Sequence, residues 1–280
     1  MGLASSSSGS VPQGKALVSQ KIATAEKTGI LNLSSQKLKL TSKVWSQLPL
    51  SKLKTLDVSD NSLTPTLPPE VGSQEMVLLK VLHASNNKLT QIHDMSNLTK
   101  LSTLNLDHNY LVDTSLPALS LPPQLRVLNL SYNKFTSFRQ CGGLLGLLNL
   151  AELDLSNNLL TTLEGLSVLV SLVILRLDNN CISEVPADMS MCSKLKLLSL
   201  RNNVISGKGS QGQQSIPATV FTDTCLEQLV LSGNPMLSRL MVYDFQGVDS
   251  FMERRRRSKD RNLAGGAADD SENIFGTDLK

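Results

Sequence analysis

Histidine and cysteine are two of the residue types in this sequence that could act as bases, nucleophiles or metal ligands. The histidines are His83, His93 and His108, and Asp107 directly precedes the last of them. A shared metal ion between His83 and His108 is conceivable. However, the paired spacing H-E-x-x-H of a metalloprotease helix does not occur. We therefore expect no metal site.

The cysteines and glycines give no better case for catalysis. Cys141, Cys181 and Cys192 have no histidine near them in the sequence, and we predict that they are core thiols. No glycine-rich phosphate loop follows a predicted strand. Function has to be argued from a site, so we predict no enzymatic activity and no cofactor.

The element that must position any functional side chain is a repeat of the form L-x-x-L-x-L-x-x-N-x-L. We number its positions 1 to 11 from the first leucine. Written from the first leucine to the asparagine, the copies are Leu53–Asn61, Leu79–Asn87, Leu101–Asn109, Leu125–Asn133, Leu150–Asn158, Leu172–Asn180, Leu195–Asn203 and Leu226–Asn234. A degenerate copy around Leu31 and Leu33 precedes them. Such self-similarity is the signature of a solenoid.

The physical reading of the repeat is direct. Each L-x-L is a short strand whose leucines point inward, because alternate residues face opposite sides. One copy cannot bury its leucines alone, so neighbours stack into one continuous core. The asparagine amide has both donors and an acceptor and should bond the backbone of adjacent turns. The prediction is an α/β leucine-rich-repeat solenoid, a horseshoe with a parallel concave sheet of about nine strands.

The ends should be capped by helices. We predict a helix over residues 15–27 that turns Leu17, Val18, Ile22 and Ala25 inward, and a stop at Gly29. At the other end, Tyr243, Phe245, Val248, Phe251 and Met252 should cover the last leucine layer. This gives a flexible segment 1–14, a repeat domain 15–257 with its caps, and a disordered charged tail 258–280. The Gly/Gln/Ser insertion 206–215 should be unable to order itself.

The candidate partner surface is the concave face and its rim. Positions 3 and 5 of each copy point outward there, and positions 7 and 8 lie at the rim. Two features distinguish this surface: an amphipathic patch from neighbouring repeats, and a stripe of alternating charge that suits selection of a charged partner. The partner-binding residues that we predict are His83, Asn105, His108, Tyr132, Asp154, Arg176, Asp178 and Arg201. Any one of them could equally be an ordinary solvated side chain.

Composition and the chain ends bear on location. A net charge of +3 argues against a general nucleic-acid surface. There is no apolar secretory h-region and no terminal cysteine cluster, so we expect an intracellular protein. Gly2 with Ser6 fits the N-myristoylation pattern. The run Arg254, Arg255, Arg256 and Arg257 is either a nuclear-import or anionic contact or a solvated part of the cap helix.

The two flanks of the repeats carry a resemblance. ATAEKTGILNLS (residues 23–34) and GVDSFMERRRR (residues 247–257), together with the Met-Gly start, resemble the small intracellular leucine-rich-repeat-containing protein 57 group. The resemblance covers roughly residues 23–257. It implies a non-enzymatic protein that a lipid anchors to a membrane.

The sequence therefore predicts an adaptor or scaffold that binds a protein partner on its concave face. We expect a monomer in the cytoplasm, with membrane contact through a lipidated N-terminus. The alternative is a regulatory subunit of an enzyme such as a protein phosphatase, with a nuclear location as a further alternative.

Overall fold

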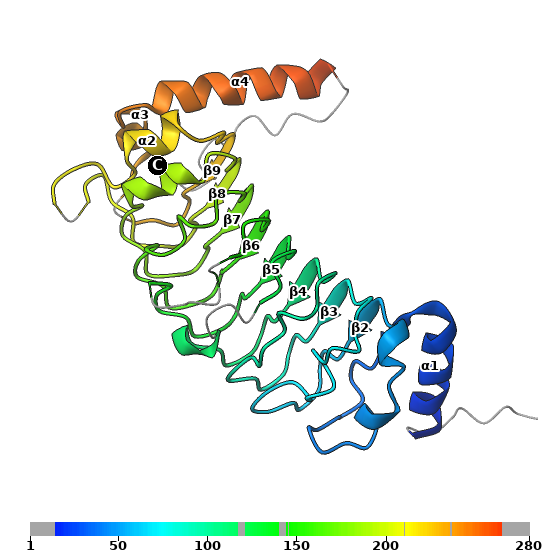
Figure 1. Cartoon of the computed structure of the whole chain (residues 1–280). Coiled ribbons are helices and arrows are strands. Elements are labelled where there is room, and N and C mark those ends of the chain that lie inside the picture. Colours follow the sequence, from blue (N-terminus) through cyan, green and yellow to red (C-terminus); the bar gives the residue numbers. More distant parts are fainter. Residues whose placement is uncertain are drawn as a thin grey trace, which may run out of the picture.

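The computed structural model describes residues 15–116, 121–139, 144, 146–209, 211–235 and 237–264. They form a curved stack of turns with one strand per turn and a helical cap at each end (Figure 1). The nine strands are parallel and lie in sequence order, so each pairs only with its neighbours along the chain. This confirms the predicted solenoid.

The strands are three residues long and begin at position 3 of each repeat. They are β1 (Ile30–Asn32), β2 (Thr55–Asp57), β3 (Val81–His83), β4 (Thr103–Asn105), β5 (Val127–Asn129), β6 (Glu152–Asp154), β7 (Ile174–Arg176), β8 (Leu197–Ser199) and β9 (Gln228–Val230). The leucine in the middle of each strand is buried, while the residues on either side are more exposed, apart from Ser199 in β8. The register pairs like positions, for example Leu153 with Leu175. The predicted repeat numbering therefore holds in space.

The recurring position 9 asparagines form the predicted ladder. Asn158 shows the pattern: its Oδ1 accepts from Phe135 N at 3.0 Å, and its Nδ2 donates to Leu130 O at 3.0 Å and Leu155 O at 3.0 Å. Two of these three bonds reach the preceding repeat. Because the residue is buried, the amide satisfies backbone groups that water cannot reach.

The caps lie where the sequence predicted them. Helix α1 (Lys15–Thr28) buries Ile22 and Ala25 against the first turn, and Gly29 ends it at a φ of 75°, with its N–H bonded to Ala25 O at 2.8 Å. At the far end lie α2 (Ala218–Thr222), α3 (Arg239–Tyr243) and α4 (Val248–Ala264). The loop side also carries short 3-10 turns: η1 (Trp45–Gln47), η2 (Leu50–Lys52), η3 (Asp113–Ser115) and η5 (Ala187–Met191).

The C-terminal cap differs from the prediction in two details. Phe245, Val248 and Phe251 are buried, but Tyr243 is exposed and stacks with Arg239 instead. Helix α4 also continues to Ala264, seven residues into the segment predicted to be disordered. The remainder of that tail, 265–280, and the segment 1–14 lie outside the described residues.

The insertion 206–215 was wrongly predicted to lack order. Lys208 pairs with Gln214 in an antiparallel bridge, and Gly209 N donates to Gln213 O at 2.6 Å. The side chain of Gln214 accepts from Gln246 N at 2.7 Å and donates to Gln246 O at 3.2 Å. The insertion is therefore a small hairpin that docks on the chain between α3 and α4, and these paired polar bonds replace the apolar burial that the segment lacks.

Candidate partner-binding surface

The rim where the strands end is shaped by a tight turn in every repeat. Position 8 has a positive φ throughout, for example 54° at Asp60 and 57° at Asn157. Asparagine, aspartate and glycine tolerate this left-handed conformation, whereas larger side chains rarely adopt it. Tyr132, at a φ of 53°, is the exception in this row; His108 has the same φ, but histidine adopts this conformation more often than tyrosine.

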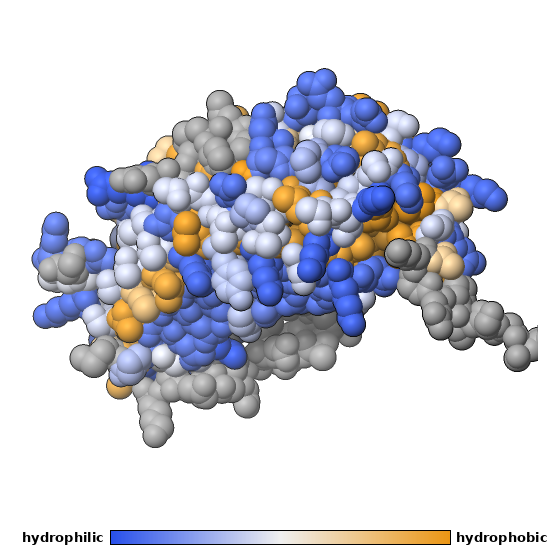
Figure 2. Space-filling model, turned by 90° about the horizontal axis from the view of Figure 1, so that it is seen from below, coloured by the Kyte–Doolittle hydropathy of each residue, from blue (hydrophilic) through white to orange (hydrophobic). Residues whose placement is uncertain are grey.

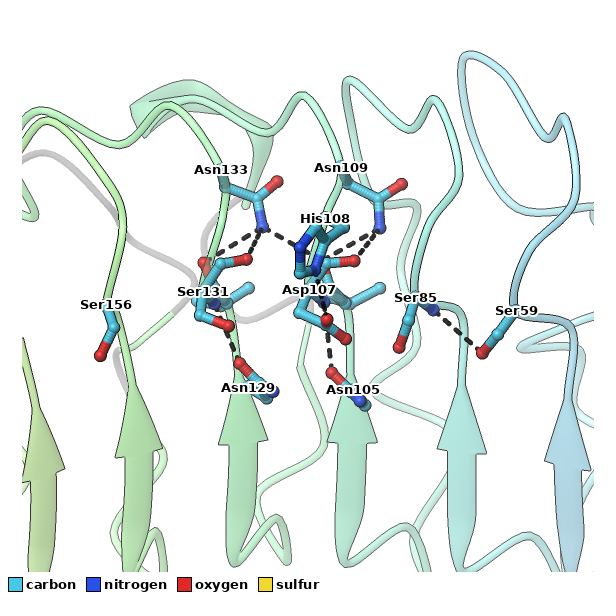
Figure 3. A network of polar contacts seen from close by, with 12 residues as sticks. Ser59, Ser85, Asn105, Asp107, His108, Asn109, Asn129, Ser131, Asn133 and Ser156 are labelled. Carbon is cyan, nitrogen blue, oxygen red and sulfur yellow. Dashed lines mark hydrogen bonds and ion pairs between the residues drawn. The ribbon is translucent and has the colours of Figure 1, made fainter. Parts of the chain in front are cut away.

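His108 and Tyr132 lie directly against each other. Their ring centroids are 4.0 Å apart and the rings are 14° from parallel. Asp107 Oδ2 lies 2.6 Å from His108 Nδ1, and this contact holds the imidazole in place (Figure 3). Tyr132 remains 48% exposed and the His108 side chain 44% exposed. Two adjacent repeats therefore present a stacked aromatic pair to solvent.

Tyr110 and Lys134 extend this pair, and sequence reasoning missed both. They occupy position 10 of the same two repeats, and the Lys134 ammonium lies 4.8 Å from the centre of the Tyr110 ring. Tyr110 is 46% exposed. Their place in the repeat was the available signal, since position 10 also follows the rim. We call His108, Tyr132, Tyr110 and Lys134 the aromatic rim cluster.

His83 does not join the cluster. It lies at the end of β3 beside Asn105 on β4, and within the described part of the chain no ring contact joins it to His108 or Tyr132. In the same part of the chain, no group of three or more histidine, cysteine or acidic side chains could hold a metal ion.

Two of the position 5 residues that we predicted as contacts, Asn105 and Asp154, have a structural role. Asp154 Oδ1 accepts from Ser156 N at 2.9 Å, and Asn105 Oδ1 accepts from Asp107 N at 3.2 Å. This Asx turn ends the strand and begins the turn. His83 does not accept this bond in its own repeat; Ser59 Oγ of the preceding repeat accepts from Ser85 N at 3.2 Å instead (Figure 3).

The charged stripe is likewise divided between structural and accessible groups. Asp178 accepts from Ser199 Oγ at 2.5 Å and from Arg201 N at 2.9 Å, so its carboxylate links two repeats. Among the described residues, neither the Arg176 nor the Arg201 guanidinium forms an ion pair. The stripe thus offers two unpaired cations next to acids that the fold already uses.

The arginine run lies on α4 and is not a uniform solvated row. Arg254 Nε donates to Leu226 O at 3.2 Å and its Nη2 donates to Phe221 O. Burial lowers the pKa of Arg254 from its ordinary value, while nearby Cys225 and Glu227 raise it. Arg257 pairs with Glu253 one turn earlier. Arg254 is therefore a clip between the cap helix and the last repeat.

The cysteines also differ in part from the prediction. Cys192 is buried as expected, but Cys181 is exposed because position 10 faces solvent. Cys225 is exposed too and lines a cleft with Lys196, Glu227 and Arg254. Cys141 lies outside the described residues, as does Gly2, so lipidation at Gly2 stays a prediction. No helix in the described ranges is long and apolar enough to cross a membrane.

Comparison with known proteins agrees with this geometry. The family described as Leucine Rich repeats (2 copies) matches residues 123–168, and Leucine Rich Repeat matches residues 52–74. The chain is 33% identical to cattle (Bos taurus) Toll-like receptor 6 over 55% of its length and 19% of the receptor. It is 37% identical to chicken (Gallus gallus) lumican over 57% of its length and 45% of lumican. The chain thus spans less than half of these relatives.

Solved structures share the fold. A leucine-rich-repeat protein of Leptospira interrogans superposes with a TM-score of 0.64 at 29% identity, over 80% of this chain and 53% of that one. A TDR receptor shares the fold with a TM-score of 0.52 at 20% identity, over 77% of this chain and 37% of the receptor. The molecule is a leucine-rich-repeat solenoid. The chain belongs to the leucine-rich-repeat superfamily.

Proposed function

We propose that this protein is a non-enzymatic adaptor or scaffold that binds a protein partner at the rim of the concave sheet where the strands end. The aromatic rim cluster lies at the centre of this surface. Repeat solenoids use their extended concave surfaces for binding. The observation that carries the proposal is the stacked pair His108 and Tyr132, whose tyrosine is held in a left-handed backbone conformation that is unfavourable for it.

The energetics support a binding role for the pair. A bulky residue in the left-handed region costs about 1–3 kcal/mol, and neighbouring repeats avoid this cost with asparagine at Asn157 and Asn179. Backbone strain of this kind clusters at ligand sites. Tyrosine also buries a large area at small entropic cost and is frequent at binding hot spots.

Arg176 and Arg201 would favour a partner with a negative charge near them and would orient it. They lie further along the same concave surface, on β7 and just after β8, without an ion pair in the described structure. A partner that places an apolar side chain on the aromatic rim cluster and a carboxylate near these guanidinium groups would satisfy both. Bidentate arginine–carboxylate pairing would then favour one orientation of the partner.

Affinity purification with quantitative mass spectrometry tests the proposal. The double variant His108→Asn and Tyr132→Asn removes the rings and keeps a residue that tolerates the turn. Asn157→Gly with Asn179→Gly is the matched control at position 8. A stoichiometric partner should be lost only with the first variant; a partner retained by it would refute the site. A co-purifying enzyme would favour the regulatory-subunit alternative.

A further inference from the structure

The opposite rim of the sheet, where the strands begin, carries a row of positive charge. It is supplied by position 2 and by the residue directly before position 1, which we call position 0, in four consecutive repeats. No acidic residue occupies positions 0 to 3 of these repeats. The members of this basic row are Lys52, Lys54, Lys80, Lys100 and Arg126, all exposed. It lies beside β2 to β5, at the other end of the strands from the aromatic rim cluster.

The position 2 residues are immediate neighbours across the sheet. Lys80 N donates to Lys54 O at 2.8 Å, Ser102 N to Lys80 O at 2.9 Å, and Arg126 N to Ser102 O at 2.9 Å. This backbone ladder places Lys54 and Lys80 on adjacent strands, roughly 4.8 Å apart, and Arg126 two strands beyond Lys80. Like charges on adjacent strands destabilise a sheet.

Further along the same backbone ladder, an acidic side chain neutralises a lysine at position 2. Glu227 N donates to Lys196 O at 2.8 Å, so these two residues are related as Lys80 is to Lys54. There the side chains form an ion pair at 3.7 Å. In the described part of the chain, no member of the basic row has an ion pair. Within the described residues, repulsion in the row is therefore left unbalanced.

The shape of the row limits what can neutralise it. It is a narrow band of side chains across four strands, roughly 14 Å long. The other rim of the same strands carries Asp57, Asp60 and Asp107, which would repel a broad polyanion such as a membrane surface or a nucleic acid. On the face of the molecule seen from below, hydrophobic patches of different sizes lie among hydrophilic side chains (Figure 2). A narrow acidic chain fits the row better.

We propose that the basic row binds an acidic segment of a partner protein, which runs across β2 to β5 along the N-terminal rim. Its glutamate or aspartate carboxylates pair with the lysine and arginine head groups and relieve the repulsion between adjacent strands. This surface is separate from the aromatic rim cluster and does not depend on it.

Fluorescence anisotropy with a labelled (Glu-Ser)5 peptide tests this inference, and (Gln-Ser)5 serves as the neutral probe. The rim variant is Lys54→Glu, Lys80→Glu and Arg126→Glu. The control Lys43→Glu, Lys88→Glu and Lys208→Glu changes three exposed cations outside the row by the same charge. At low salt, wild type and control should bind the acidic probe alike. The rim variant should bind at least tenfold more weakly.

A neutral variant, Lys54→Gln, Lys80→Gln and Arg126→Gln, separates binding from folding. It should bind the probe weakly while its thermal unfolding midpoint at low salt equals or exceeds that of wild type. Equal losses in the rim and control variants would overturn the proposal, because net charge alone would then explain them. So would failure of wild type to bind the acidic probe.

Two further arms exclude other occupants. Sedimentation with vesicles containing phosphatidylserine should pellet wild type no better than the rim variant. If wild type pelleted better and no peptide bound, the row would be assigned to a membrane and the proposal overturned.

Replacement of the acids at 269, 270, 272 and 278 by their amides should leave probe affinity unchanged. A tenfold gain would identify this segment of the chain as the occupant.

Discussion

Position 8 shows at the scale of single residues how recognition and stability oppose each other. Asn157 and Asn179 suit the left-handed turn, whereas Tyr132 occupies the same conformation against its preference. Relief of this strain is worth about 1–3 kcal/mol, and loss of the ring stack costs about 0.5–1.5 kcal/mol. We therefore predict that Tyr132→Asn raises the free energy of unfolding by about 1 kcal/mol, as measured by urea denaturation.

The reciprocal change provides the control. Asn179→Tyr puts a tyrosine on the same turn two repeats beyond Tyr132, with no ring on either adjacent repeat to stack on, and should lower the free energy of unfolding by about 1 kcal/mol or more. If Tyr132→Asn were destabilising instead, the turn would not be strained and the main support for a binding role would disappear.

The thiols allow a second prediction at this scale. Burial, and to a lesser extent Asp188, raises the pKa of Cys192 from 9.0 to about 11. Only the thiolate reacts with iodoacetamide, and at pH 8 about one Cys192 thiol in a thousand is ionised. Peptide mapping of the native protein at pH 8 should find Cys181 and Cys225 alkylated and Cys192 intact. Rapid labelling of Cys192 would contradict its place in the core.

The raised pKa of Cys192 also determines how the stability of the protein depends on pH. The folded pKa of Cys192 lies above the unfolded value, so its contribution to stability is fully present below about pH 9. It is lost as the pH rises toward 11, because the unfolded chain then releases the proton more readily.

At the scale of elements, α4 is attached to the last repeat by more than apolar contact. Phe251 is buried, and Arg254 donates to the carbonyls of Leu226 and Phe221. The Arg254→Met variant keeps much of the side-chain volume but leaves both carbonyls without this donor. The expected loss in the free energy of unfolding is on the order of 1–3 kcal/mol, with faster hydrogen exchange in β9.

Arg256→Met is the matched control on the same helix. Arg256 is exposed, and surface substitutions of this kind usually change stability by less than about 0.5 kcal/mol. Equal effects of the two variants would show that Arg254 is not a clip but one more member of a solvated run.

At the scale of the whole molecule, the repeat pattern predicted what depends on period alone. The stacking of strands, the buried leucines and the asparagine ladder follow from residues such as Leu153 and Asn158 recurring in register. What could not be predicted depends on side-chain bonds between segments. The hairpin held by Gln214 and Gln246, and the division of acids such as Asp178 between structure and surface, have no periodic signal.

The candidate surfaces illustrate the same limit. His108 and Tyr132 were predicted because they stand out at one repeat position. Tyr110 was missed because its role depends on the neighbouring Lys134. The basic row was missed because each lysine by itself is an ordinary surface residue. Its lack of ion pairs stands out only by comparison with Lys196, which occupies an equivalent position and pairs with Glu227.

A solenoid of this kind should respond locally to damage in its core, since each repeat contacts only its neighbours. Leu153 on β6 is fully buried and pairs with Leu128 and Leu175 on either side. Leu153→Ala should cost about 2–5 kcal/mol in the free energy of unfolding. Hydrogen exchange should lose protection in β5, β6 and β7 first, while β2 and β9 change little. The exposed Leu159, in the same repeat, gives the control variant Leu159→Ala, which should leave both measurements unchanged. Uniform loss of protection from β1 to β9 would mean that the stack unfolds as one cooperative unit.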